Sequence, residues 1–209
     1  MLYLPDSNLV FLHIPRTGGT FIKGAIRQLG IRFEVIEKSH LPWLEAQEIK
    51  PEADFFTFVR HPATWLQSYW GHRMTIGWGG DLTIAHEYQD DNFNRFTEKV
   101  ETDYPGFIEE LYTPYLKEGM PIQVGYFENL TEDLHRILES AGEQSDLELI
   151  ESIRPINVTP ENLKVQVEYK PEVYSLVCDR EKKIMERLGY EQNNIRSFPG
   201  LSDLERRIR

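Results

Sequence analysis

One segment constrains the fold of this chain more than any other: residues 11–20, where an apolar run enters a turn with two adjacent glycines. The run from Leu9 to Ile14 is rich in strand-forming residues. The stretch from Gly18 to Leu29 then carries apolar side chains at helical spacing, and Gly30 follows where a helix would stop. A strand, a glycine turn and a helix in this order favour an α/β protein, because the helix must return along the face of a sheet.

The rest of the chain continues the alternation of strands and helices. Further strands are predicted at 32–36, 55–59 and 122–126. Further helices are predicted from Pro62 towards Trp70, within 105–117, where Pro114 can kink or end the helix, and at 131–141 and 171–188. Residues 71–91 are rich in glycine, so we expect an irregular insertion within 71–104, on the side of the molecule that binds the substrate. The pattern predicts a three-layer α/β fold, a parallel β-sheet flanked by helices, in a single domain over residues 1–209.

Composition excludes several classes of protein. The 209 residues carry a formal net charge of −11 and 40% apolar residues, which fits a globular domain and argues against a general nucleic-acid binder. Cys178 is the one cysteine, so an internal disulfide and a four-cysteine zinc site are excluded. No apolar run approaches the roughly 18 residues that span a bilayer. Met1 to Asp6 shows no signal-peptide pattern, so we expect a cytoplasmic protein without a membrane span.

The turn after the first strand has the features of an anion-binding loop. Gly18 and Gly19 let a ligand approach the backbone closely, and the start of the following helix favours negative charge. Arg16 adds a planar fork of donors, and Thr17 and Thr20 add hydroxyl groups. A plain strand-to-helix turn with a glycine hinge explains the same residues equally well, so the loop alone leaves both interpretations open.

This loop differs from the Walker A motif, G-x-x-x-x-G-K followed by serine or threonine, because its basic residue precedes the glycines. The strand at 55–59 is followed by Arg60 rather than by a metal-binding aspartate, at the position where open α/β sheets bind ligands. Arg60 and Ser68 of the next helix can share one phosphate, although each alone is more often a surface arginine or a helix-face serine. We therefore expect a pocket that holds a nucleotide anion without a metal.

Taken together, these segments resemble the sulfotransferases that use 3′-phosphoadenosine 5′-phosphosulfate (PAPS). The stretch His13-Ile-Pro-Arg-Thr-Gly-Gly-Thr20 is similar to H-I-P-K-T-G-G-T of the carbohydrate sulfotransferase branch, with arginine in place of lysine. The second motif of the family reads approximately V-R-D-P-x-x-R-x-x-S-x-Y, and this chain matches it at Val59, Arg60, Pro62 and Ser68. His61, Trp65 and Trp70 depart from it. Weaker similarity extends the resemblance to about residues 9–190.

The resemblance implies a P-loop NTPase-like sulfotransferase fold and a set of donor-binding residues. It assigns the 5′-phosphosulfate to the first loop, at Arg16, Thr17, Gly18, Gly19, Thr20 and Phe21. It assigns the 3′-phosphate to Arg60 and Ser68. The missing second arginine, replaced by Trp65, weakens that second assignment.

The resemblance also suggests a catalytic base. His40 lies in His40-Leu-Pro-Trp43, similar to a catalytic histidine setting in related carbohydrate sulfotransferases. A loop histidine making a structural hydrogen bond is the alternative, and His72, His86 and Glu45 are further candidates for the base. The four tryptophans are predicted either to line an acceptor site or to pack in the core: Trp43, Trp65, Trp70 and Trp78. Core packing is favoured for Trp65 and Trp70.

The expected reaction is transfer of a sulfuryl group from PAPS to an acceptor hydroxyl, of a carbohydrate or a small alcohol, with His40 as base and Arg16 at the transferred group. The expected product is 3′-phosphoadenosine 5′-phosphate (PAP), and no metal is expected. Two alternatives stay open: a Mg²⁺-dependent P-loop kinase of small molecules, and a non-catalytic nucleotide-binding module. Nucleic acid is not an expected partner.

Overall fold

The structure, a computed structural model, describes residues 1–36, 40–80, 82–116, 119–154 and 159–190. Its contacts divide the chain into two compact units. Within the described residues, the first unit consists of 1–60 and 112–154, and the second consists of 61–111 and 159–190. The single domain predicted for 1–209 stays a prediction, because residue 81 and the stretches 155–158 and 191–209 lie outside the described residues.

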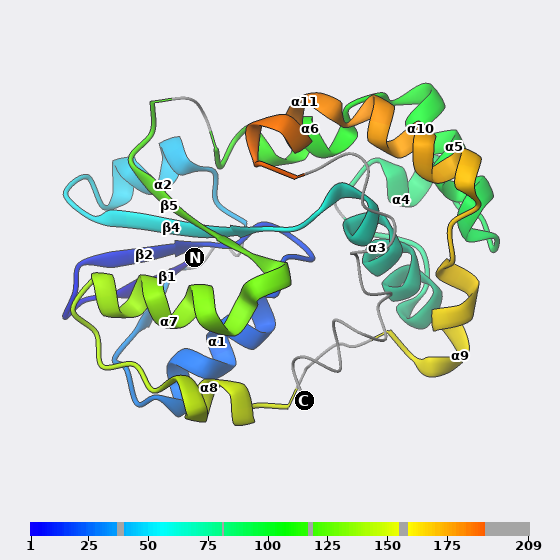
Figure 1. Ribbon diagram of the computed structural model, residues 1–209. Helices are drawn as coiled ribbons and strands as arrows, with labels where there is room; N and C mark the ends of the chain where they lie inside the picture. The colour runs from blue at the N-terminus through cyan, green and yellow to red at the C-terminus, as the bar shows by residue number, and fades with distance from the viewer. Residues whose placement is uncertain (37–39, 81, 117–118, 155–158, 191–209) are drawn as a thin grey trace. The chain divides into compact units, whose positions relative to one another are not determined.

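The first unit contains a five-stranded sheet with the order β3-β1-β2-β4-β5 (Figure 1). Its strands are β1 (Leu2–Leu4), β2 (Leu9–Leu12), β3 (Glu34–Val35), β4 (Asp54–Val59) and β5 (Ile122–Tyr126). β2, β4 and β5 are parallel, whereas β1 runs antiparallel to both of its neighbours. The α/β class is therefore confirmed, with a sheet that is mixed and mostly parallel.

The prediction of an all-parallel sheet is wrong at the β1 and β3 side of the sheet. β1 forms a hairpin with β2, with Leu4 opposite Leu9, and thereby occupies the position beside β2. The chain that leaves the first helix can pair only beyond β1, so the strand predicted at 32–36 shortens to the two exposed residues Glu34 and Val35. The hairpin escaped prediction because its first strand has only three residues.

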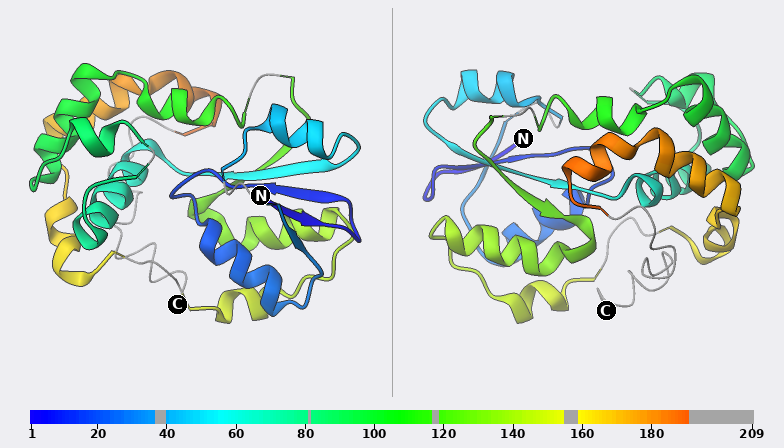
Figure 2. Two further views of the ribbon diagram at one scale, coloured as in Figure 1. Left: turned by 180° about the vertical axis from the view of Figure 1, so that it is seen from behind. Right: turned by 45° about the horizontal axis from the view of Figure 1, so that its top comes forward.

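Helices cover both faces of this sheet. One face is covered by three helices that share a hydrophobic core with β1, β2 and β4: α1 (Gly19–Gln28), α7 (Leu130–Ser140) and α8 (Leu147–Ser152). The opposite face is covered by α2 (Trp43–Ile49), where Trp43 packs against Phe55 (Figure 2). These elements follow the sequence pattern closely, because residues 55–59 of β4 are apolar except for Thr57. Gly30 and Gly142 end α1 and α7 with positive φ angles.

β5 has the predicted bounds. It is an edge strand, and Gly125 is its only fully buried residue. A Cβ at Gly125 would lie 2.5 Å from the ring of Phe58, so glycine is required for β5 to approach β4. The short helix η1 (Phe127–Asn129) follows β5 directly and leads into α7.

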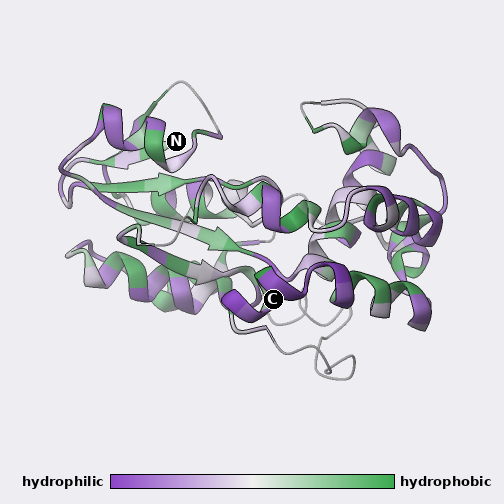
Figure 3. Ribbon diagram, turned by 90° about the horizontal axis from the view of Figure 1, so that it is seen from above, coloured by the Kyte–Doolittle hydropathy of each residue, from purple (hydrophilic) through white to green (hydrophobic). Residues whose placement is uncertain are grey.

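The second unit is helical within the described residues. Its helices are α3 (Pro62–Ile76), α4 (Ile84–Glu87), α5 (Phe93–Asp103), α6 (Phe107–Tyr112, whose last residue belongs to the first unit), α9 (Glu161–Lys164), η2 (Val165–Val167), α10 (Pro171–Arg180) and α11 (Lys182–Arg187). α10 packs against α3 and α5. Alternating hydrophobic and hydrophilic residues along the helices are visible in Figure 3. No helix in the described part of the chain is long and apolar enough to cross a membrane.

Two helix predictions in this unit need correction. The irregular insertion expected from Gly71 does not begin there, because α3 continues through Gly71 to Ile76. Gly71 packs against Thr159, where a Cβ would lie 2.9 Å from the Thr159 side chain. The helix predicted at 171–188 breaks at Glu181. The Glu181 carboxylate accepts the backbone N–H groups of Ile108 at 2.8 Å and Glu109 at 3.1 Å, which caps α6. Neither distant contact has a local sequence signal.

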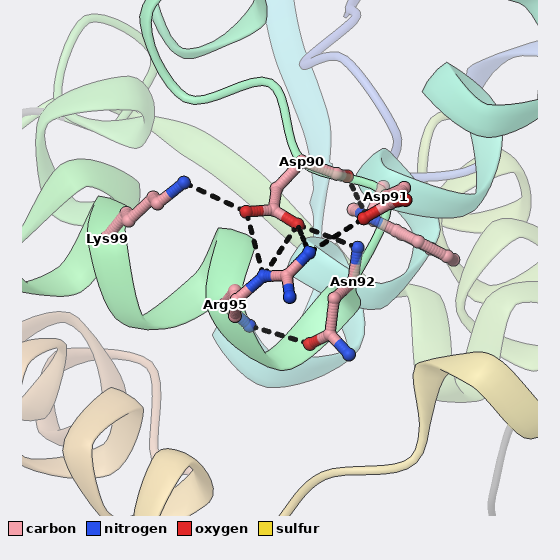
Figure 4. Close-up of polar contacts among 6 residues, drawn as sticks. Asp90, Asp91, Asn92, Arg95 and Lys99 are labelled. Atoms are coloured by element: carbon pink, nitrogen blue, oxygen red, sulfur yellow. Dashed lines mark hydrogen bonds and ion pairs between the residues drawn. The ribbon is translucent and has the colours of Figure 1, made fainter.

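An ionic cluster fixes the start of α5 (Figure 4). Arg95 and Lys99 both bind the Asp90 carboxylate at 2.8 Å, and the Asn92 side chain accepts the Arg95 backbone N–H at 3.0 Å. The hydrogen bonds from Arg95 hold the pKa of Asp90 well below its usual range. The backbone carbonyl of Asp90 accepts the indole N–H of Trp70 at 2.9 Å, so the cluster also satisfies a buried tryptophan.

Candidate functional site

The carboxyl ends of β2 and β4 form the edge on which the candidate site is built. The two parallel strands are in register, with Leu12 opposite Thr57. The Thr57 hydroxyl donates to the carbonyl oxygen of Leu12 at 2.6 Å, which ties the end of β2 to its neighbour. The loop that starts at His13 and the residue after β4, Arg60, therefore leave the same edge of the sheet, as predicted.

The loop between β2 and α1 has a strained, tightly held backbone. Arg16 has a φ of 66°, which non-glycine residues rarely adopt, and Gly18 has a φ of 90°. The buried Thr17 hydroxyl donates to the carbonyl of Ile14 at 2.8 Å and closes the turn. Thr17 thus serves the shape of the loop, a role that we had not distinguished from ligand binding.

The start of α1 is suited to an anion. The first hydrogen bond of the helix runs from the Ile22 amide to the Gly18 carbonyl at 3.1 Å, so the amides before Ile22 precede the hydrogen-bond ladder. The N-cap residue, Gly18, has no side chain to cap this end, and the first turn contains no acidic residue. Thr20 is exposed and Phe21 is buried, so Phe21 contributes its backbone to this turn and its ring to the core.

Gly19 is required by a close contact, and Gly18 by its positive φ together with tight packing. A Cβ at Gly19 would lie 2.0 Å from the ring of His13. A Cβ at Gly18 would lie 3.1 Å from Leu130 and 3.3 Å from Phe127, at a φ that already favours glycine. The Gly-Gly pair is therefore explained by packing inside the first unit as well as by the approach of a ligand.

Arg60 brings a permanent positive charge to this loop. It is only 3% exposed, its Nη1 donates to the Arg16 carbonyl at 3.4 Å, and its Cζ lies 3.9 Å from the centre of the Phe127 ring. The hydroxyl of Tyr112 contacts the Arg60 backbone on both sides, accepting from its N–H at 3.2 Å and donating to its carbonyl at 2.8 Å. The structure thus brings together the arginines of the two sequence motifs.

His40 also lies beside this loop. Its Nδ1 is 2.9 Å from the carbonyl oxygen of His13, and the two imidazole rings are 4.8 Å apart. A carbonyl oxygen only accepts hydrogen bonds, so the contact assigns the proton to Nδ1 and leaves the Nε2 lone pair of a neutral His40 available as a base. This contact is also the structural hydrogen bond that we considered as the alternative role, and the geometry accommodates both roles.

His13 differs from its neighbour His40 because it is largely buried. Burial, with a smaller contribution from His40, lowers the pKa of His13 to about 3. His13 is therefore neutral near pH 7, and its ring stacks on Phe11 and covers Gly19. It therefore supports the loop.

The remaining candidates are less closely grouped. Ser68 is buried in α3 and belongs to the second unit, as do His72 and His86. The loop belongs to the first unit, so these three residues are described separately from it. Glu45 lies in the first turn of α2. Core packing is confirmed for Trp65 and Trp70, which are fully buried. Trp43 is almost fully buried as well, so the burial of these three tryptophans does not support the predicted acceptor wall. Trp78 is partly exposed.

Sequence reasoning missed two residues of the site, Tyr112 and Phe127. Tyr112 lies far from Arg60 in the sequence, at the end of α6, and its apolar neighbours suggest only a helix face. Phe127 follows β5 at the same edge of the sheet as Arg60, so the rule that ligands bind at the carboxyl ends of parallel strands was the signal that could have found it.

Comparison of the sequence with protein-family models finds no model that matches the chain, and no curated protein matches it either. Within the described residues, no group of three or more histidine, cysteine, aspartate or glutamate side chains is arranged to hold a metal ion.

Proposed function

We propose that this protein is a PAPS-dependent sulfotransferase that acts on the hydroxyl group of a carbohydrate or small alcohol. The observation that carries the proposal is the contact between the two motif arginines, in which the Arg60 guanidinium reaches the carbonyl of Arg16. Two segments that resemble separate phosphate-binding motifs thus meet at one sheet edge, together with the start of α1. The P-loop-like sulfotransferase fold, with PAP as product, is part of the same proposal.

The residues at the edge fit the anionic groups of such a donor. The first turn of α1 and the side chains of Arg16 and Thr20 suit the 5′-phosphosulfate, because backbone amides and a guanidinium both stabilise negative oxygen atoms. Arg60, held on Phe127, suits the 3′-phosphate. The role of Ser68 rests on the sequence resemblance alone.

The proposed reaction needs one base and one stabilised leaving group. The Nε2 of His40 takes the proton of the acceptor hydroxyl, and the acceptor oxygen forms a bond to sulfur. The bond between sulfur and the bridging phosphate oxygen breaks, and its electron pair remains on the phosphate of PAP. Arg16 and the amides of α1 stabilise the charge that develops there, so positioning and electrostatics supply most of the rate.

The test is transfer from PAPS in the presence of EDTA, followed through PAP release over a panel of sugar and alcohol acceptors. We expect acceptor-dependent PAP release by the wild type and a loss of at least about a hundredfold in His40→Ala, the range of general-base catalysis. His135→Ala is the matched control, because His135 belongs to the same unit and bonds Ser145 instead of the loop. Transfer that requires Mg²⁺ and ATP, or binding of PAPS without any turnover, would replace this proposal by the kinase or by the binding module.

Two further expectations stay predictions from the sequence. They are the cytoplasmic location and the absence of a nucleic-acid partner, the second of which rests on the net charge of −11.

A further inference from the structure

The backbone and the side chain of Arg60 are held by two different residues. Arg60 lies one residue beyond the last β4–β5 ladder pair, Val59 with Tyr126, where a peptide group needs a new partner. The Tyr112 hydroxyl is that partner. It accepts a hydrogen bond from the Arg60 backbone N–H at 3.2 Å and donates one to the Arg60 carbonyl oxygen at 2.8 Å. Tyr112 is fully buried, so this double contact is shielded from water.

Phe127 holds the other end of the same residue. The guanidinium carbon of Arg60 lies 3.9 Å from the centre of the Phe127 ring, a distance at which a flat cation and an aromatic face attract each other. The same ring packs near Gly18, where a Cβ would come within 3.3 Å of it. Phe127 therefore contacts the basic residue after β4 and lies close to the loop after β2.

We propose that Tyr112 and Phe127 are positioning residues that aim the Arg60 guanidinium at the 3′-phosphate of the nucleotide and thereby set the preference for 3′-phosphorylated nucleotides. This inference rests on the proposed function. An arginine that is already immobilised loses little freedom when an anion binds, so its charge contributes more fully to affinity. Neither residue needs to touch the nucleotide, and both act through Arg60.

The experiment measures the dissociation constants of PAP and ADP by calorimetry, because PAP carries a 3′-phosphate and a single 5′-phosphate, whereas ADP carries a 5′-diphosphate and no 3′-phosphate. In Tyr112→Phe we expect PAP to bind about tenfold more weakly, the effect of losing a hydrogen bond that orients a charged group. ADP affinity should not change. In Phe127→Leu we expect a loss of about threefold to tenfold, again for PAP alone. Tyr115→Phe is the control, since Tyr115 is another buried tyrosine of the same segment, and it should leave both affinities unchanged.

A double-mutant cycle separates positioning from general loosening of the fold. If Phe127 acts through Arg60, Phe127→Leu should have no further effect on PAP affinity once Arg60 has been replaced by alanine. This cycle also decides the matter if Tyr112→Phe does not fold. Equal losses for PAP and ADP, or full PAP preference in both single variants, would overturn the inference.

The wild-type measurement distinguishes failure of the inference from failure of the proposed function. If the wild type binds PAP no better than ADP, the proposed function fails and the inference fails with it. If the wild type prefers PAP and the variants keep that preference, only the inference is overturned.

Discussion

Each of the two units buries an ionisable group, and the two groups are treated in opposite ways. Arg60 of the first unit is 3% exposed and keeps its charge, because a guanidinium does not release its proton in proteins. It is surrounded by groups that accept a cation, the Arg16 carbonyl and the Phe127 ring. Glu101 of the second unit is fully buried, and neither of its carboxylate oxygens has a hydrogen-bond partner among the described residues.

Under the proposed function, the difference separates a buried charge that binds a ligand from a buried group that does not. Burial, reinforced by nearby Glu181, raises the pKa of Glu101 to about 9, so this carboxyl group is protonated and neutral near pH 7. Burial raises the pKa of Glu181 as well, to about 7. The second unit removes its buried charge by binding a proton, whereas the first unit retains a charge and holds it against the Arg16 carbonyl and the Phe127 ring.

The largest effect that we predict concerns this proton. Glu101 binds a proton in the folded protein up to about pH 9 but loses it near its ordinary pKa of 4.5 when unfolded. Its contribution to stability is therefore complete below pH 4.5 and is lost as the pH rises towards 9. The free energy of unfolding should fall by up to about 1.4 kcal/mol per pH unit over this range.

Glu101→Gln should remove the part of this fall in the free energy of unfolding that Glu101 causes. Glu181 should still contribute a fall up to about pH 7. Urea unfolding at pH 5, 7 and 9 measures the effect. Glu98→Gln, at an exposed position of the same helix, should keep the wild-type pH dependence. Parallel pH profiles for the wild type and Glu101→Gln would show that Glu101 is not buried as a neutral acid.

The next effect tests the charge that the first unit retains. Arg60→Ala should weaken PAP binding by about 3 kcal/mol, more than a hundredfold, because a buried and oriented charge is lost. Arg136→Ala is the control, since Arg136 is exposed on α7 and pairs with Asp133. Calorimetric titration measures both, and unchanged affinity in Arg60→Ala would remove this residue from the site.

A smaller effect is expected at the loop glycines. Gly19→Ala should destabilise the protein by about 2 kcal/mol, because the new Cβ would overlap the ring of His13. Gly30→Ala meets no atom within 4 Å and should cost only about 1 kcal/mol for its φ of 71°. Thermal unfolding compares the two, and an equal or smaller shift for Gly19→Ala would contradict the described contact with His13.

The smallest effect concerns backbone strain at Arg16. Its φ of 66° is unfavourable for a residue with a Cβ, so Arg16→Gly should raise the free energy of unfolding by about 1 kcal/mol. Arg16→Ala keeps the Cβ and should give no such gain. Both variants should bind PAP more weakly, and a stability gain from alanine as large as that from glycine would rule out relief of strain as its cause.

The sequence predicted the parts of the fold that depend on local patterns. The bounds of β5, the apolar run of β4 and the ends of α1 and α7 at Gly30 and Gly142 all follow from neighbouring residues. The break of the last long helix at Glu181 did not, because its carboxylate binds the amides of a distant helix. The continuation of α3 through Gly71 depends in the same way on Thr159.

The same distinction applies to the candidate site. The loop, Arg60 and His40 could be singled out because each stands in a short motif, and the structure places them at one edge of the sheet. Tyr112 was missed because only the tertiary fold brings its hydroxyl to the Arg60 backbone. A sequence motif can therefore identify a candidate binding residue such as Arg60. It does not identify a residue such as Tyr112, which holds Arg60 in place through a tertiary contact.

The most direct test of the account is a thermal-shift titration of the wild type with PAP, ADP and ATP–Mg²⁺. A ligand at about 100 times its dissociation constant should stabilise the folded state by about 2.7 kcal/mol. The account predicts that PAP stabilises the protein without metal, and more strongly than ADP at equal concentration. Stabilisation by ATP–Mg²⁺ alone, or by none of the three, would contradict it.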